Sequence, residues 1–186
     1  MIAFIVLLVV IIALVLFGIS AFNKLRTLDV KAQEALGGID VQLTRRADLI
    51  PNLVETVKGY ASHESGVFEE VTAARAAVTK AAASGTVEQK AEASAALDKS
   101  LVNVMAVAEN YPDLKASTNF LDLQKQLTDT ENQLSFARQY YNDAVSSLNT
   151  AVVTFPSMLF AGVAGVAKRA FYAAPEGQTT PPQVRF

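Results

Sequence analysis

An uncharged apolar run at the N-terminus constrains this chain more than any other feature. Residues 2–22 contain no charged side chain, and only Gly18 and Ser20 interrupt their apolar character. A helix of that length, rising about 1.5 Å per residue, crosses a hydrocarbon core of about 30 Å. The sequence therefore predicts a transmembrane anchor over residues 1–23 and makes the lipid bilayer the first expected partner.

The charges beside the run predict its orientation. Lys24, Arg26 and Lys31 follow it, whereas only the terminal amine precedes it. Because basic residues favour the cytoplasmic side, we expect a single-pass protein of the cell membrane, with its N-terminus outside and the remaining residues cytoplasmic. A secretory signal peptide is the alternative, since Gly18 and Ser20 resemble the small residues before a cleavage site. The absence of a basic n-region and the length of the run favour an uncleaved anchor.

Composition excludes several functional classes. The net charge is −2 with both signs interspersed, so no basic surface is expected and nucleic acid is not a predicted partner. The chain has no cysteine, which excludes disulfides, thiolate metal sites and thiol catalysis.

Apolar residues recur at helical spacing through the rest of the chain. The longest stripe predicts one helix over residues 116–155, stopped by Pro156, and consists of Phe120, Leu123, Leu127, Thr130, Leu134, Ala137, Tyr141, Ala144, Leu148, Ala151 and Phe155. Three further stripes start at Leu25, Leu53 and Leu97. Short connections force successive helices to reverse. We therefore predict an all-α fold, in which the anchor precedes an elongated antiparallel four-helix bundle over residues 24–156.

Local signals set the expected helix boundaries. Thr86 and Gln89 form a capping box after the Ser84-Gly85 turn. The first helix after the anchor carries Leu25, Leu28, Ala32, Ala35, Ile39 and Leu43 on its stripe. We expect it to end over residues 48–51, because a residue before proline avoids helical geometry.

The C-terminal part divides into two predicted segments. Residues 157–172 form an apolar segment. Its residues 158–167 are uncharged and are followed by two cations, Lys168 and Arg169. Ten residues are too few to span a bilayer alone. Because the last helix returns toward the anchor, the expected membrane contacts are Leu159, Phe160, Lys168 and Arg169. The alternative is an apolar flap packed on the bundle or on another subunit. Residues 173–186, rich in proline and polar residues, are expected to be disordered.

Candidate chemistry is sparse. His63 is the only histidine and lacks the second ligand of a zinc helix or a di-iron bundle, so an exposed helix position explains it best. Glu64 falls on the stripe that starts at Leu53, where a carboxylate needs a cation such as Arg75 or Arg138. With Glu131, these residues form a predicted buried polar network. The alternatives for Glu64 are an exposed stripe edge and a ligand or divalent-ion site.

A polar group marks the expected turn after the first helix. Cations favour a helix C-terminus and Asp favours the next N-terminus, so capping explains Arg45, Arg46 and Asp48. The alternative is a partner-binding turn at the tip of the bundle, which also includes Asn52.

Several motifs together resemble the LemA family. They cover nearly the whole chain and comprise residues 39–54 (IDVQLTRRADLIPNLV), 57–64 (VKGYASHE), 109–116 (ENYPDLKA), 130–132 (TEN), 137–138 (AR), 141–142 (YN) and 155–156 (FP). The resemblance implies a bacterial, N-terminally anchored membrane protein with a long four-helix bundle. It implies no reaction.

These features predict a function without catalysis. The first hypothesis is a non-enzymatic, membrane-anchored scaffold, a homo-oligomer that organises membrane or envelope components and needs no cofactor. The second is an adaptor for an unlike membrane-protein partner, such as a membrane protease or signalling complex. The third is a ligand or metal sensor that uses Glu64, Glu109 or Glu131.

Overall fold

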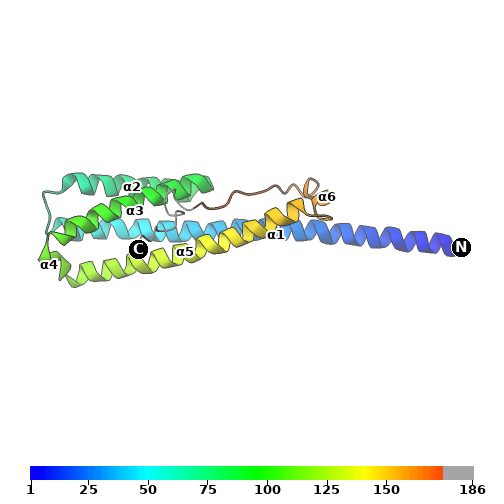
Figure 1. The fold of residues 1–186 in the computed structure, drawn as a ribbon, viewed down its shortest axis with the longest axis horizontal. Helices are drawn as coiled ribbons and strands as arrows, with labels where there is room; N and C mark the ends of the chain where they lie inside the picture. The colour runs from blue at the N-terminus through cyan, green and yellow to red at the C-terminus, as the bar shows by residue number, and fades with distance from the viewer. Residues whose placement is uncertain (174–186) are drawn as a thin grey trace, which may run out of the picture. The chain divides into compact units, whose positions relative to one another are not determined.

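The computed structural model describes residues 1–173, and every regular element in this range is a helix. The helices are α1 (Ile2–Lys58), α2 (Ser65–Ser84), α3 (Val87–Glu109), α4 (Pro112–Lys115), α5 (Thr118–Val153) and α6 (Met158–Ala161) (Figure 1). The predicted all-α class is confirmed. Apart from Ala173, the predicted disordered tail lies outside the described residues.

The helices contribute to two compact units. One unit combines Met1–Leu36 with Tyr140–Phe171, and we call it the anchor unit. The other contains Gly37–Gln139 and Tyr172, and we call it the helical unit. Both α1 and α5 therefore contribute one part to each unit.

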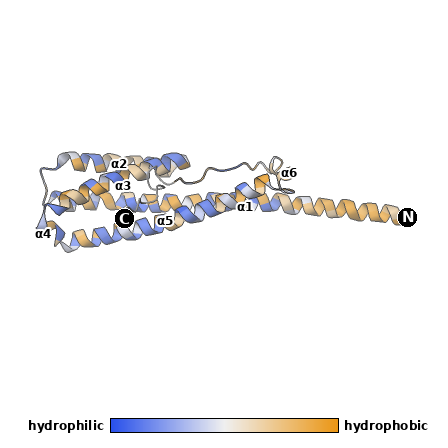
Figure 2. Ribbon diagram, viewed as in Figure 1, coloured by the Kyte–Doolittle hydropathy of each residue, from blue (hydrophilic) through white to orange (hydrophobic). Residues whose placement is uncertain are grey.

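The first part of α1 is apolar on every side. Figure 2 shows continuous hydrophobic colouring from the N-terminus along this part of α1. Within the described chain, α1 is the one helix long and apolar enough to cross a membrane, and none of its most apolar stretch is buried by protein. A helix that is hydrophobic all round needs an apolar environment. The predicted apolar N-terminal helix is confirmed as an element.

Farther along, α1 does not end where the sequence predicts. It continues through Pro51 to Lys58, so the expected boundary over residues 48–51 is wrong. Proline has no N–H and leaves the carbonyl four residues earlier without its helical donor. That carbonyl belongs to Ala47, and Nε of Arg75 in α2 donates to it at 3.0 Å. A side chain from another helix thus replaces the missing bond.

The connection between α2 and α3 follows the sequence closely. The backbone N–H of Gln89 donates to Oγ1 of Thr86 at 3.3 Å, and the backbone N–H of Thr86 donates to Oε1 of Gln89 at 2.9 Å. The predicted capping box is confirmed. A Cβ on Gly85 would lie 2.7 Å from the carbonyl oxygen of Ala81, so the turn requires glycine. Nζ of Lys90 donates to the Ala82 carbonyl at 3.0 Å and pairs with Asp40 of α1.

Most of the long stripe on α5 is buried as expected, but Ala137 and Ala144 are only half-buried, and Val145, which the stripe omits, is fully buried. Phe120, Leu134 and Leu148 are 1% exposed or less, and Thr130 is buried between them with its hydroxyl donating to the Gln126 carbonyl. The prediction fails at the end, because α5 stops at Val153 and Phe155 lies beyond it, 77% exposed. Leu114 in the separate short helix α4 is also fully buried.

Candidate functional site

Four charged side chains gather inside the helical unit, and we call them the charge cluster: Arg46 from α1, Asp98 from α3, and Glu131 and Arg138 from α5. Nη1 of Arg46 lies 2.5 Å from Oδ1 of Asp98 and 2.9 Å from Oε2 of Glu131. Nη1 of Arg138 lies 3.4 Å from Oε1 of Glu131. Arg46 is the most buried member, with 7% of its side chain exposed. The cluster thus joins three helices through charge pairs.

Arg138 extends the cluster toward the end of the described chain. Its Nη2 donates to the buried hydroxyl oxygen of Ser94 in α3 at 2.8 Å. Its guanidinium also lies 5.1 Å from the centre of the Tyr172 ring, within cation–π range. Burial raises the pKa of the Tyr172 phenol, and the nearby Arg138 charge opposes that rise without cancelling it. Tyr172 is therefore held as a neutral phenol against the cation.

The members of the charge cluster are paired with one another across helices. A guanidinium carries N–H donors and no acceptor, so both arginines serve as partners for carboxylates. Both carboxylates lie beside cations, and breaking a pair in such a place is costly because it leaves a charge uncompensated. Between residues 1 and 173, no group of three or more His, Cys, Asp or Glu side chains is placed to hold a metal ion.

A groove of about 540 Å³ runs beside the charge cluster. Arg46 and Glu131 form part of its wall, and the remaining lining is Leu101, Met105, Gln124, Leu127, Thr128 and Asn132. The amide of Gln124 donates to the sulfur of Met105 at 3.4 Å across this wall. Helices α1, α3 and α5 therefore meet at a surface with both apolar and polar side chains.

The predicted polar network is only partly assembled. Glu131 and Arg138 contact each other, whereas Arg75 donates to the Ala47 carbonyl. Glu64 is not on an apolar stripe, because the chain leaves α1 at Lys58 and Glu64 precedes the first residue of α2. The register that begins at Leu53 therefore breaks before Glu64. His63 is exposed in the same connection.

The predicted partner-binding turn is a continuous part of α1. The expectation of a turn is therefore wrong, although Arg45, Asp48 and Asn52 are exposed on the helix. Nη1 of Arg45 donates to Oε1 of Gln133 at 3.1 Å. Arg45 and Asp48 also line a groove of about 390 Å³ with Asp40, Val41 and Thr44. Arg46 differs from the other three because it is buried.

Sequence periodicity contained a signal for Arg46. Continuing the spacing of the first stripe beyond Leu43 places residues 46, 50, 53 and 57 on one face, and all four are buried. An arginine on an apolar stripe requires carboxylates from neighbouring helices. The expected helix end at Pro51 divided this face between two helices, so the position of Arg46 on one continuous stripe was not recognised. Lys90, also nearly fully buried and paired with Asp40, was missed because its capping role depends on another helix.

In the anchor unit, the predicted membrane contacts fall into two groups. Leu159 is 63% exposed and Lys168 is exposed, whereas Phe160 packs on Phe17 with ring centres 6.3 Å apart. Arg169 forms two hydrogen bonds to Oδ1 of Asp29, at 2.9 Å from Nε and 2.7 Å from Nη2. Arg169 therefore stabilises contacts within the protein.

Comparison with known proteins identifies the family. The chain is 22% identical over 182 residues to the magnetosome protein MamQ of Magnetospirillum gryphiswaldense, a match covering 85% of this chain and 67% of the relative. It is 24% identical over 183 residues to the magnetosome proteins MamQ 1 and MamQ 2 of Paramagnetospirillum magneticum, with the same coverage. The model of the LemA family matches residues 35–186. This match includes α2–α5 and the charge cluster, and the chain therefore belongs to the LemA family.

Proposed function

We propose that this protein is a non-enzymatic scaffold that α1 anchors in the cell membrane and that associates with further copies of itself. In this proposal the helical unit is an antiparallel four-helix bundle built from the second part of α1, α2, α3 and the first part of α5. Its role is to organise membrane or envelope components through the association of copies that are each anchored in the bilayer. No cofactor is required.

The exposed alanine surface of α2 is the observation that carries this proposal. Ala73, Ala76 and Ala77 are exposed, although α2 also buries Phe68, Val71 and Val78 on its inner face. Ala73 and Ala76 line a groove of about 620 Å³, and Ala77 lines another of about 510 Å³ that Ala96 of α3 shares. Small side chains let helices approach closely. A second copy can therefore bring a helix near the α2 backbone without displacing large side chains.

The mass of the detergent-solubilised protein tests self-association. We expect an oligomer for the natural chain. The double substitution Ala73→Glu and Ala77→Glu should shift it toward monomer, because the carboxylates introduced on two copies would repel each other where the helices approach closely. Both positions are exposed, so helix content measured by circular dichroism should be unchanged. The matched control places Glu at Gln126 and Ser135, two exposed positions of α5, and should keep the natural mass. A natural chain that stays monomeric at cellular concentration argues against the scaffold.

A second candidate function is an adaptor for an unlike membrane protein. The groove beside Arg45 and Asp48 supports it, because both charge signs line a surface of α1. Affinity purification from native membranes separates the two functions. A scaffold recovers further copies of this chain, whereas an adaptor recovers a stoichiometric unlike protein that is lost with Arg45→Glu and Asp48→Lys together.

A further inference from the structure

We propose that residues 154–167, here the re-entrant loop, insert into one leaflet of the bilayer beside α1 to about the depth of Gly18. This inference rests on the proposed anchoring by α1 and adds a second membrane contact. In this proposal, the acyl chains of that leaflet cover the exposed apolar surface of the loop.

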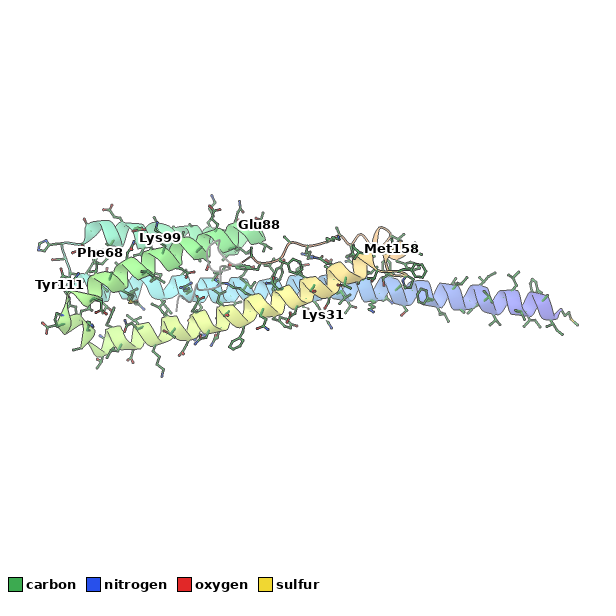
Figure 3. The ribbon with its side chains drawn as sticks, viewed as in Figure 1. Lys31, Phe68, Glu88, Lys99, Tyr111 and Met158 are labelled. Carbon is green, nitrogen blue, oxygen red and sulfur yellow. The ribbon has the colours of Figure 1, made fainter. Side chains whose placement is uncertain are left out.

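The first argument is the position of Phe160. A Cβ on Gly18 would lie only 3.1 Å from Cε1 of Phe160, and the Phe17 and Phe160 rings meet at 65°. Gly18 and Phe17 belong to the uncharged run, six and seven residues before Lys24. At about 1.5 Å per residue, Phe160 therefore lies roughly 9 Å to the apolar side of the first charge. Figure 3 shows Met158, two residues earlier, beside α1.

The second argument is the surface that the loop leaves open. Phe155, Leu159 and Val163 are 77%, 63% and 79% exposed, whereas the small residues Ala161 and Ala164 are buried. No charged residue lies in 144–167. On the neighbouring part of α1, the apolar residues Phe17 and Ile19 are 47% and 52% exposed, so both elements leave apolar surface open. The bilayer that would cover α1 at the level of Gly18 would also surround the loop.

The third argument is the way in which the chain returns from the loop. Arg169 pairs with Asp29, which is eleven residues after Gly18 and so about 16 Å farther along α1. The side-chain amide of Asn149 accepts from the Arg169 backbone N–H and donates to its carbonyl oxygen, both at 2.9 Å. The hydroxyl of Tyr141 donates to the Ala170 carbonyl at 2.8 Å. Polar contacts therefore hold the chain that returns from the loop at the level of Asp29, five residues beyond Lys24.

Lys168 marks the expected boundary between acyl chains and headgroups. Its side chain is exposed and, unlike Arg169, has no ion pair with any described residue. A lysine at this level can extend its ammonium group toward lipid phosphates while its stem stays in the apolar region. The exposed Lys24 of α1 provides a second such cation.

Site-specific labelling of the full chain tests the insertion. Because the chain has no cysteine, Leu159→Cys and Val163→Cys each introduce one labelling site for a polarity-sensitive fluorophore. The variants are reconstituted in phosphatidylcholine and phosphatidylglycerol vesicles that contain lipids with a nitroxide on the acyl chain. We expect blue-shifted emission and quenching several-fold stronger than at Ser135→Cys in the helical unit.

Ile12→Cys, in the middle of the apolar run, provides the reference for α1. Quenching at position 12 without quenching at 159 and 163 would overturn the loop insertion and leave the anchor intact. No quenching at position 12 would overturn the proposed anchoring and the insertion together. Sites 159 and 163 that resist both the lipid nitroxide and a water-soluble quencher would show that protein covers the loop, which also overturns the proposal.

Discussion

Two buried cations, Arg46 and Lys90, each pair with groups from other helices. Arg46 neutralises two carboxylates from different helices, and Lys90 combines an ion pair with a bond to a helix-terminal carbonyl. Neither residue stands out by type, since exposed lysines and arginines are common. Their importance comes from their place on buried helix faces, where an uncompensated charge is costly.

Replacing Arg46 should destabilise the helical unit. Arg46→Met keeps much of the side-chain volume but leaves Asp98 and Glu131 without their shared cation. Both carboxylates are about one third exposed, so water limits the cost to about 2 kcal/mol, less than for a fully buried pair. Denaturant unfolding in detergent, followed by circular dichroism, measures this difference. Arg45→Met is the matched control, because Arg45 is next to Arg46 in the sequence but is exposed. It should change the free energy of unfolding by no more than about 0.5 kcal/mol.

The Tyr172 phenol should make stability depend on alkaline pH. Its pKa is raised above 10.0 in the folded protein, mainly by burial. The resulting contribution is fully present below the unfolded pKa and is lost as the pH rises through the folded pKa. Between about pH 9 and 11, Tyr172→Phe should therefore lose stability less steeply than the natural protein. Thermal unfolding across this range provides the measurement, and Tyr60→Phe, at an exposed site, is the control. Parallel curves for the natural chain and Tyr172→Phe would contradict the effect.

At the level of elements, α1 continues through Pro51 where a side chain of α2 donates to the Ala47 carbonyl. The sequence predicts the Thr86 capping box correctly because all its bonds lie within four residues. It fails at Pro51 because the compensating donor is Arg75, which only the folded arrangement brings to Ala47. The same limit explains Glu64, where a regular spacing continues through a connection that is not helical. The capping box was therefore predictable from the sequence, whereas the donor that α2 supplies to Ala47 was not.

A double-mutant cycle tests the relation between Pro51 and Arg75. Arg75→Met should cost about 1 kcal/mol in the natural chain, because the buried Ala47 carbonyl then lacks a donor. Pro51→Ala supplies the missing backbone N–H, so the same Arg75 substitution should cost less than half as much in that background. Unfolding free energies of the four variants give the coupling. Strictly additive effects would mean that Arg75 acts through other contacts.

Loss of the capping box should weaken the start of α3. Thr86→Ala removes the acceptor for the Gln89 backbone N–H and should lower the unfolding free energy by about 1 kcal/mol. Thr86→Ser retains the hydroxyl and should recover most of that loss. Equal destabilisation by both variants would point to the methyl group of Thr86 instead. Thermal unfolding of the three proteins distinguishes these results.

For the whole molecule, the charges beside the anchor predict the side of the membrane on which the helical unit lies. Because basic residues favour the cytoplasmic side, Lys24, Arg26 and Lys31 predict that the helical unit lies in the cytoplasm. Protease added to intact cells should leave the unit uncut, and permeabilised cells should lose it. Replacing the three basic residues with Gln should increase the fraction that is cut in intact cells. Ready digestion of the natural chain from outside would reverse the assignment.

The order of the helices along the chain also has a consequence for synthesis. Arg45 of α1 and its partner Gln133 of α5 are 88 residues apart in the sequence, and the sequence separation of Arg46 and Glu131 is similar. At about 5–20 residues per second, a ribosome needs roughly 4–18 s to make the intervening chain. During that interval the stripe from Ile39 to Val57 has no α5 to cover it. We therefore expect the nascent protein to pass through a stage in which this apolar surface is open to chaperones, and a chain truncated after Ala116 should be recovered with them when it is purified from cells.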